Sequence, residues 1–209
     1  MRDFDVRSAL HRKVLREHHG DSDTLVIDEL GLRHGVSRVD VAVVNGYLHG
    51  FEIKSDSDTL ERLPSQICIY NSVLDRATLV VGEKHAEKAK VLLPDWWGVK
   101  VAFEGPRGGI EFSQEKKPLM NPSIDAVALA ELLWKSEAIS ILRERGTPEA
   151  FLRKPRAFLY KHLAEVVELK ELRDLIRHKL KSRVRWRGLQ QPLSDADLSK
   201  PIPTLTNSL

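Results

Sequence analysis

The sequence has little cysteine and no long apolar run, and each shortage excludes a class of protein. Cys68 is the single cysteine among 209 residues, which rules out an internal disulfide and a cysteine-based zinc cluster. The longest apolar stretches, such as residues 126–133, are too short to cross a bilayer, so we expect no membrane partner. Residues 1–17 are charged throughout and lack the apolar core of a secretory signal, so a cytoplasmic protein is expected.

What is present describes a globular protein with uneven charge. Hydrophobic residues make up 42% of the chain and charged residues 30%, which is typical of a soluble folded protein. Residues 123–187 hold fifteen Lys or Arg against nine Asp or Glu, a net of +6, so the remainder carries −3. A basic part beside a slightly acidic part suits a module that holds phosphate next to one that needs carboxylates, although a solvated charged surface has the same composition.

The hydrophobic pattern predicts an α/β part followed by a helical part. Pro64 interrupts one helical pattern, so we expect a kink or a later helix start there. A long helix is expected from Ser123 to Gly146, with shorter helices after it. We expect helices near residues 4–18, 60–74 and 84–92, and strands over 24–30, 38–44, 48–54, 78–81, 98–104 and 110–113. The predicted units are residues 1–115, a basic helical domain over 123–187, and a flexible tail over 188–209.

Two neighbouring strands carry the residues with the clearest chemistry. Val39, Val41 and Val43 alternate with Arg38, Asp40 and Ala42, so the three valines are expected to share one face and Asp40 to lie on the other. Asn45-Gly46 predicts a hairpin. A two-residue turn would pair Asp40 with Phe51, whereas a three-residue loop pairs it with Glu52. We therefore predict the three-residue loop, with Gly46 in a bulge that uses its left-handed conformation.

This pairing suits a metal-dependent reaction on phosphodiesters. Two carboxylates about 5 Å apart can share one Mg²⁺ ion. Lys54 lies on the same face as Glu52, where its ammonium group could orient the attacking water. Glu-x-Lys occurs three times in this chain and is weak alone, but only this copy follows an Asp-bearing strand across a hairpin. An ordinary half-solvated sheet is the alternative.

Asp40, Glu52-Ile53-Lys54 and the later Gln66 and Tyr70 together resemble the PD-(D/E)XK nuclease superfamily. The Gln-x-x-x-Tyr spacing looks like that of its RecB-like nucleases, and residues 37–82 resemble an uncharacterised bacterial branch. The resemblance covers about residues 5–82 and departs at Val39, where many members have proline. It implies a restriction-endonuclease-like αβββαβ core with a mixed sheet, dependence on Mg²⁺ or Mn²⁺, and hydrolysis of nucleic acid, with DNA favoured. The expected fold is this α/β core followed by a small all-helical C-terminal domain.

The resemblance also suggests accessory site residues. The superfamily often adds an acidic residue from its first helix, for which Glu17 is the matching candidate. Glu29, at the end of the first predicted strand, is preferred because it could lie across the hairpin from Asp40, whereas Glu17 could equally be a solvated helix carboxylate. Gln66 and Tyr70 share a helix face, where they would brace Lys54 or touch DNA, or would simply belong to the core.

A basic run near the end of the helical part completes the predicted site. We expect it to contact a phosphate backbone together with Arg38, although cations late in a helix also favour its dipole. The residues of the run assigned to nucleic-acid binding are Lys179, Lys181, Arg183, Arg185 and Arg187.

The predicted function is therefore a Mg²⁺-dependent nuclease. The alternatives are a catalytically silent nucleic-acid-binding module and a nuclease subunit active only in a complex. A homodimer or a larger defence or repair complex is expected, with bacterial defence against phage the favoured role.

Overall fold

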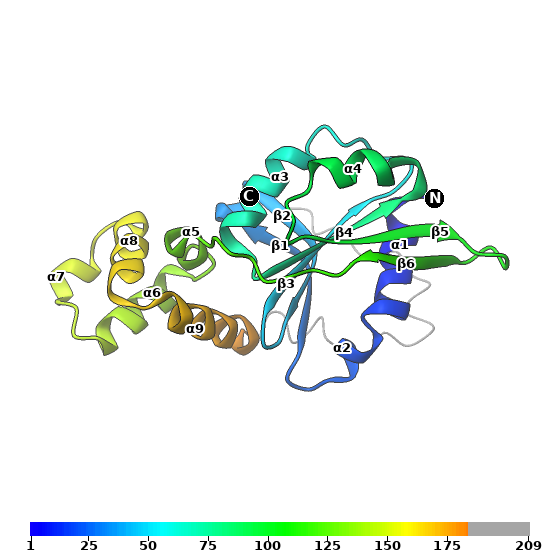
Figure 1. Ribbon diagram of the computed structural model, residues 1–209. Helices are drawn as coiled ribbons and strands as arrows, with labels where there is room; N and C mark the ends of the chain where they lie inside the picture. The colour runs from blue at the N-terminus through cyan, green and yellow to red at the C-terminus, as the bar shows by residue number, and fades with distance from the viewer. Residues whose placement is uncertain (184–209) are drawn as a thin grey trace, which may run out of the picture.

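The computed structural model describes residues 1–183 as a six-stranded mixed sheet with helices on both faces and a helical part beside it (Figure 1). The strands lie side by side in chain order. The β1–β2, β2–β3 and β5–β6 pairs are antiparallel, and the β3–β4 and β4–β5 pairs are parallel. Their bounds are β1 Leu25–Leu32, β2 Ser37–Val44, β3 Leu48–Lys54, β4 Arg76–Gly82, β5 Gly98–Glu104 and β6 Ile110–Lys116. The expected α/β class with a mixed sheet is confirmed.

Helices formed by the first 92 residues cover the two faces of the sheet. On one face, α1 (Asp3–Ala9) continues through a π-helical segment (Leu10–Val14) into α2 (Arg16–Gly20). On the other, α3 (Leu63–Val73) connects β3 to β4, and a 3₁₀ turn (Glu83–His85) with α4 (Ala86–Leu92) connects β4 to β5. Parallel strands require such crossovers. Pro64 lies in the first turn of α3, where proline is tolerated, so the later helix start is confirmed.

The side chains of β2 do not alternate regularly between the two faces. Val41 packs on the α1 side and Ala42 on the α3 side, as a regular strand requires. Val39 also belongs to the core on the α3 side, so the prediction that it shares a face with Val41 and Val43 is wrong. The irregularity lies beside Asp40, where the β1–β2 ladder skips a pair opposite Glu29, whose φ is 57°.

The hairpin between β2 and β3 has the predicted three-residue loop. Val44 pairs with Leu48 and Val41 with Phe51, which leaves residues 45–47 as the loop. The Asn45 side chain accepts a hydrogen bond from the Tyr47 amide at 3.1 Å, and the Asn45 amide donates to the Tyr47 carbonyl at 3.1 Å. Gly46 is not among the described residues with positive φ, so the prediction of a left-handed glycine there is wrong. The asparagine side chain, an Asx-type contact, closes the turn instead.

The helical part begins after β6 and contains five short helices up to Arg183, where the described residues end. They are α5 (Ala126–Ala130), α6 (Lys135–Glu144), α7 (Glu149–Leu152), α8 (Arg156–Val166) and α9 (Leu169–Ser182). The single helix predicted from Ser123 to Gly146 is wrong, because Asp125 caps α5 and the chain turns again before α6. Gly146 does end α6, with φ of 78°, a conformation that glycine adopts without strain.

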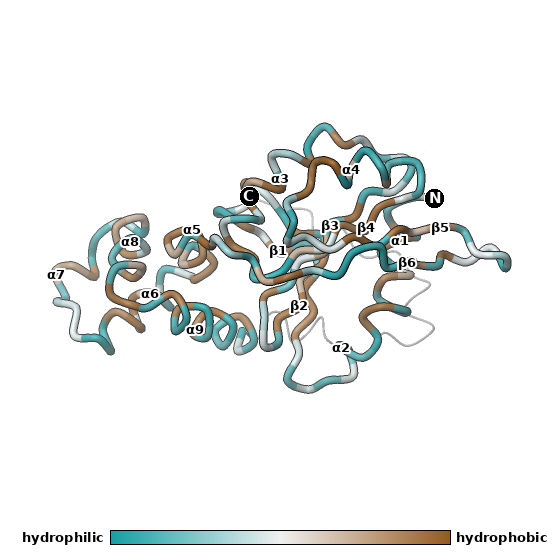
Figure 2. The backbone as a smooth tube through the Cα atoms, in the orientation of Figure 1, coloured by the Kyte–Doolittle hydropathy of each residue, from teal (hydrophilic) through white to brown (hydrophobic). Residues whose placement is uncertain are grey.

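The helical part packs against the sheet rather than standing apart. One continuous apolar core joins α3, the sheet and helices α5 to α9. Figure 2 shows apolar and polar residues alternating along α9, whose apolar residues Leu172, Ile176 and Leu180 are buried. The separate domains predicted from the sequence stay a prediction. Within residues 1–183, none of the helices is both long and apolar enough to cross a membrane.

Candidate functional site

A polar cavity of about 480 Å³ lies where β1, β2, β3, α1 and α3 meet. Glu17, the alternative acidic residue, is exposed on α2 and does not line the cavity. Tyr70 is buried behind Glu52. The other residues predicted for the catalytic site, together with Arg38, all line the cavity: Glu29, Arg38, Asp40, Glu52, Lys54 and Gln66.

Glu52 is the buried centre of this cluster. Its side chain is 1% exposed and accepts hydrogen bonds from Lys54 Nζ at 2.6 Å, Gln66 Nε2 at 2.5 Å and the Tyr70 hydroxyl at 2.5 Å. Gln66 and Tyr70 are one turn apart on α3, so both reach the same carboxylate. They hold Glu52 rather than Lys54. Burial, reinforced by the Glu52 carboxylate, raises the pKa of Tyr70 far above its ordinary value, so the hydroxyl stays a donor.

Asp40 lies next to Glu52 and is held by a cation that the sequence did not single out. Val41 pairs with Phe51, so Asp40 and Glu52 are the next residues along the two strands. The Asp40 carboxylate accepts from the Ile53 amide at 2.7 Å and from Arg7 Nη2 at 3.1 Å.

Arg7 also joins Asp40 to the neighbouring strand. Its Nη1 atom donates to the Asp40 carbonyl at 3.0 Å and to Glu29 Oε1 at 2.7 Å. Glu29 therefore lies on the Asp40 side of the sheet, as expected, but it contacts Asp40 through Arg7. Nothing in the sequence around Arg7 distinguishes it from other helix cations.

The electrostatics of the cluster favour the protonated form of Asp40. Burial raises the pKa of Asp40 to about 7, and the Glu52 carboxylate adds to the increase, while the Ile53 amide and Arg7 oppose it. Neutral pH is therefore close to the midpoint at which this carboxyl gains or loses its charge. A buried network of this kind stabilises one arrangement of the strand ends when every member has a partner.

The donor set of the cavity does not fit Mg²⁺ as it is arranged. A divalent cation needs free carboxylate oxygens, but each carboxylate oxygen of Asp40 and Glu52 already accepts from a protein donor. Arg7 and Lys54 supply the positive charge that a metal would supply. Among residues 1–183, no group of three His, Cys, Asp or Glu is placed to hold a metal. Mg²⁺ or Mn²⁺ binding stays a prediction, and it requires Arg7 to leave Asp40.

The residues predicted to contact nucleic acid are dispersed. Arg38 is exposed at the cavity, and Lys179 is half-buried on α9. Lys181 binds Asp23 at 2.8 Å. Arg183 is buried and donates to Glu137 and the Leu132 carbonyl, so it does not face solvent as a phosphate contact requires. Arg185 and Arg187 lie outside the described residues.

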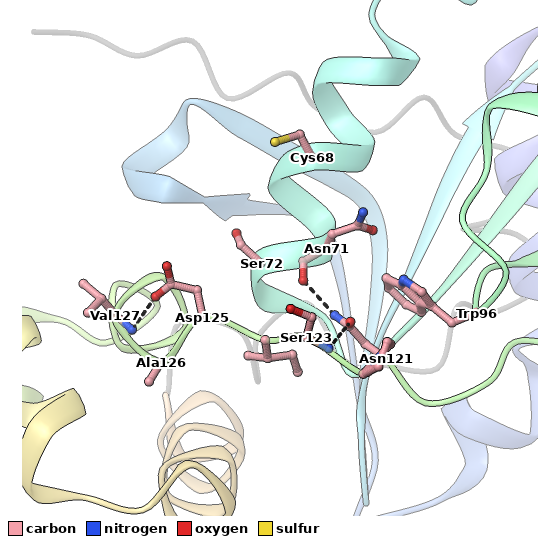
Figure 3. A pocket seen from close by; sticks show the side chains of 11 residues that line it. Cys68, Asn71, Ser72, Trp96, Asn121, Ser123, Asp125, Ala126 and Val127 are labelled. Atoms are coloured by element: carbon pink, nitrogen blue, oxygen red, sulfur yellow. Dashed lines mark hydrogen bonds between the residues drawn. The ribbon is translucent and has the colours of Figure 1, made fainter.

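A second cavity, of about 530 Å³, lies at the junction between α3 and the segment that leads into α5 (Figure 3). The side-chain Nδ2 of Asn121 donates to the backbone carbonyls of Asn71 and Leu74 at 2.8 Å, which fixes this segment on the end of α3. Asp125 caps α5 here by accepting from the Val127 amide. The polar side chains of Asn121 and Asp125 already form hydrogen bonds with backbone groups. Among the described residues that line this cavity, no charged side chain is therefore left for a ligand.

Comparison with known proteins gives one consistent result. The family model described as bacteriophage P4 protein cII matches residues 3–193. Protein cII of Enterobacteria phage P4, a curated relative, is 28% identical over 162 residues. That alignment covers 78% of this chain and 60% of the relative, so the chain spans less than two thirds of the relative's length. No solved structure matches the chain.

These matches overturn the resemblance to PD-(D/E)XK nucleases. The predicted phosphodiester hydrolysis, the enzyme class and the role in bacterial defence against phage are corrected with it. The motifs suggested a nuclease because a buried carboxylate needs the same hydrogen-bond donors whether or not it is catalytic. Lys54, Gln66 and Tyr70 are the donors that satisfy Glu52, and their spacing follows from sharing a strand face or a helix face with it.

Proposed function

This chain belongs to the bacteriophage P4 protein cII family, and on that premise we propose that it is a regulatory protein that binds nucleic acid, with DNA the first candidate. The observation that carries the proposal is a cluster of exposed cations around the start of α8. We call it the α8 basic cluster: Arg153, Lys154, Arg156 and Lys161.

Most other cations of the helical part are engaged inside the protein. Salt bridges join Arg145 to Glu171, Arg173 and Arg177 to Asp75, Lys181 to Asp23 and Arg183 to Glu137. No such bridge holds the four members of the α8 basic cluster within the described part of the chain. Their charge is therefore available to an external anion.

The local structure keeps this cluster in solvent. Residues 153–158 are exposed without interruption, because Pro155 ends one helical turn and opens α8. Leu159, Tyr160 and Leu163 form the buried stripe of α8, and the cations lie off it. The start of α8 has no side-chain cap, so its positive dipole end adds to the local charge.

Binding through these cations has a measurable salt dependence. Four phosphate contacts give a slope of about −3 to −4 for the logarithm of the association constant against that of the salt concentration. We expect labelled DNA to bind with a slope of this size in fluorescence anisotropy. Replacing Arg153, Lys154 and Arg156 with alanine should abolish most of the slope and of the affinity.

A charge-matched variant controls for the loss of net charge. Lys88 on α4, Lys117 just after β6 and Lys170 on α9 are exposed and form no salt bridge within residues 1–183. Their replacement with alanine removes the same charge and should leave most of the binding. Equal losses in the two triple variants, or none in either, would show that the α8 basic cluster is not the binding surface.

A second candidate is self-association through the helical part. Trp134, Phe158 and Val166 are 48%, 58% and 42% exposed, although they are large and apolar. Exposed apolar side chains of this kind support a protein contact, such as a homodimer. Light scattering after size-exclusion chromatography separates the two candidates, because a monomer that binds DNA supports the first alone.

Three narrower assignments belong to this proposal. The order helix, three strands, helix, strand over residues 3–82 supports a restriction-endonuclease-like core, used here as a scaffold without enzymatic activity. The basic helical region would be the functional module attached to it. A regulator of nucleic acid would act in the cytoplasm. The binding surface and its tests do not depend on any of the three.

A further inference from the structure

An exposed aromatic side chain lies on the same helix as two members of the α8 basic cluster. Phe158 is 58% exposed and lies between Arg156 and Lys161 on α8. His162 is four residues further along, on the same side of the helix, and its ring lies 4.5 Å from the ring of Phe151. Phe151 and His162 are half-buried, so Phe158 presents the exposed ring, on the helix that also carries Arg156 and Lys161.

Within residues 1–183, the packing of the fold does not require Phe158 to be exposed. The neighbouring Leu159, Tyr160 and Leu163 fill the core, and the Tyr160 hydroxyl donates to the Leu133 carbonyl at 2.8 Å. Phe158 lies off that buried stripe, so shortening its side chain removes little core packing. An exposed benzyl ring close in sequence to four exposed cations is instead the combination found where a strand of unpaired bases is bound.

We propose that the nucleic acid bound here is single-stranded, an inference that rests on the proposed function. The cations of the α8 basic cluster contact the phosphates, and an unpaired base stacks on the Phe158 ring. A duplex keeps its base faces stacked inside and presents phosphates outside, so it would use the cations and leave the ring unused. The ring therefore gives the single strand an advantage that charge alone cannot give.

The test compares a single-stranded pyrimidine oligonucleotide with a hairpin duplex of the same length, by anisotropy at one salt concentration. The wild-type protein should bind the single strand more tightly. Phe158→Leu keeps an apolar side chain and helix propensity but loses the stacking face. It should weaken single-strand binding about 10-fold and leave duplex binding unchanged. Phe4→Leu is the matched control, since Phe4 is 48% exposed on α1, and it should change neither affinity.

The outcomes separate this inference from the function on which it rests. A preference for duplex, or equal affinities of wild type and Phe158→Leu for the single strand, would overturn the single-strand inference. If the α8 triple variant still loses duplex binding in that case, the proposed function stands. No binding of either oligonucleotide by wild type would overturn both. A base analogue whose fluorescence falls on stacking should respond to wild type and not to Phe158→Leu.

Discussion

Asp75 should be one of the most important polar residues for stability, because it joins the sheet to the helical part. Its side chain is 3% exposed and lies between α3 and β4. It accepts from the Leu48 amide at 2.8 Å and forms salt bridges with Arg173 at 3.1 Å and Arg177 at 3.2 Å, both on α9. Asp75→Asn keeps the shape and one hydrogen bond, but it leaves Arg173 without a salt-bridge partner among residues 1–183 and leaves Arg177 with Asp174 alone.

The magnitude follows from the burial of the partners. Removing one member of a buried ion pair costs about 3–5 kcal/mol when the remaining charge is fully enclosed. Arg173 and Arg177 are 23% and 15% exposed, so water recovers part of that loss, and about 2–4 kcal/mol is expected. For a protein of this size, such a loss lowers the melting temperature by about 4–16 °C.

Chemical denaturation of the wild type, Asp75→Asn and Asp174→Asn measures this contribution. Asp174 also pairs with Arg177 but is 62% exposed, so its loss should cost less than about 1 kcal/mol. Similar losses in the two variants would refute the reasoning, because the buried bridge would then contribute no more than a surface one. Proteolysis should also cut α9 faster in Asp75→Asn if this bridge is what holds the helix.

Three further predictions concern the polar cavity and the sheet. Because the pKa of Asp40 is raised, its contribution to the free energy of unfolding is favourable at low pH and is lost as pH rises through about 7. Asp40→Asn should therefore become about 2–3 kcal/mol more stable relative to wild type between pH 5 and pH 8. A pH-independent difference between the two proteins in urea denaturation would contradict this. Gly50→Ala should cost about 1–3 kcal/mol by thermal denaturation, since the added Cβ would lie 2.5 Å from Leu74 Cδ1; a variant as stable as wild type would show that Leu74 moves freely. Calorimetric titration of wild type with Mg²⁺ should show no binding heat, because Arg7 occupies the Asp40 carboxylate. Arg7→Ala should bind Mg²⁺, since it removes that contact. Binding to wild type would show that the metal displaces Arg7 from Asp40.

The strands could be predicted from the sequence more accurately than the helices after them. Residues 48–54 and 98–104 were expected as strands and are β3 and β5 with the same bounds, because alternation and turn residues are local signals. The break between α5 and α6 had no such signal, since no glycine or proline lies there. Glu137 marks it by accepting from the Trp134 amide at 2.7 Å, and tryptophan is not a usual residue at a helix start.

The sequence predicted which residues lie together in the cavity, but not what each of them binds. Hairpin register placed Asp40 beside Glu52, because one loop length fixes all later pairs. The cation that binds Asp40 is 33 residues away in sequence, and the carboxylate that binds Arg177 is 102 residues away. Such contacts depend on how helices pack on the sheet. A sequence pattern therefore cannot tell a carboxylate that binds metal from one that binds arginine.

The π-helical segment of the first helix has a consequence for how the chain tolerates insertions and deletions. The Leu15 amide bonds the Leu10 carbonyl, five residues back, so this turn contains one residue more than an α-helical turn. Deleting one residue from 10–14 would restore a regular helix and rotate everything before it by about 100°. Arg7 would then turn away from Asp40 and Glu29. The length of residues 10–14 therefore decides whether Arg7 reaches the carboxylates of the polar cavity. An insertion or deletion of one residue there should be harder to accommodate than many surface substitutions.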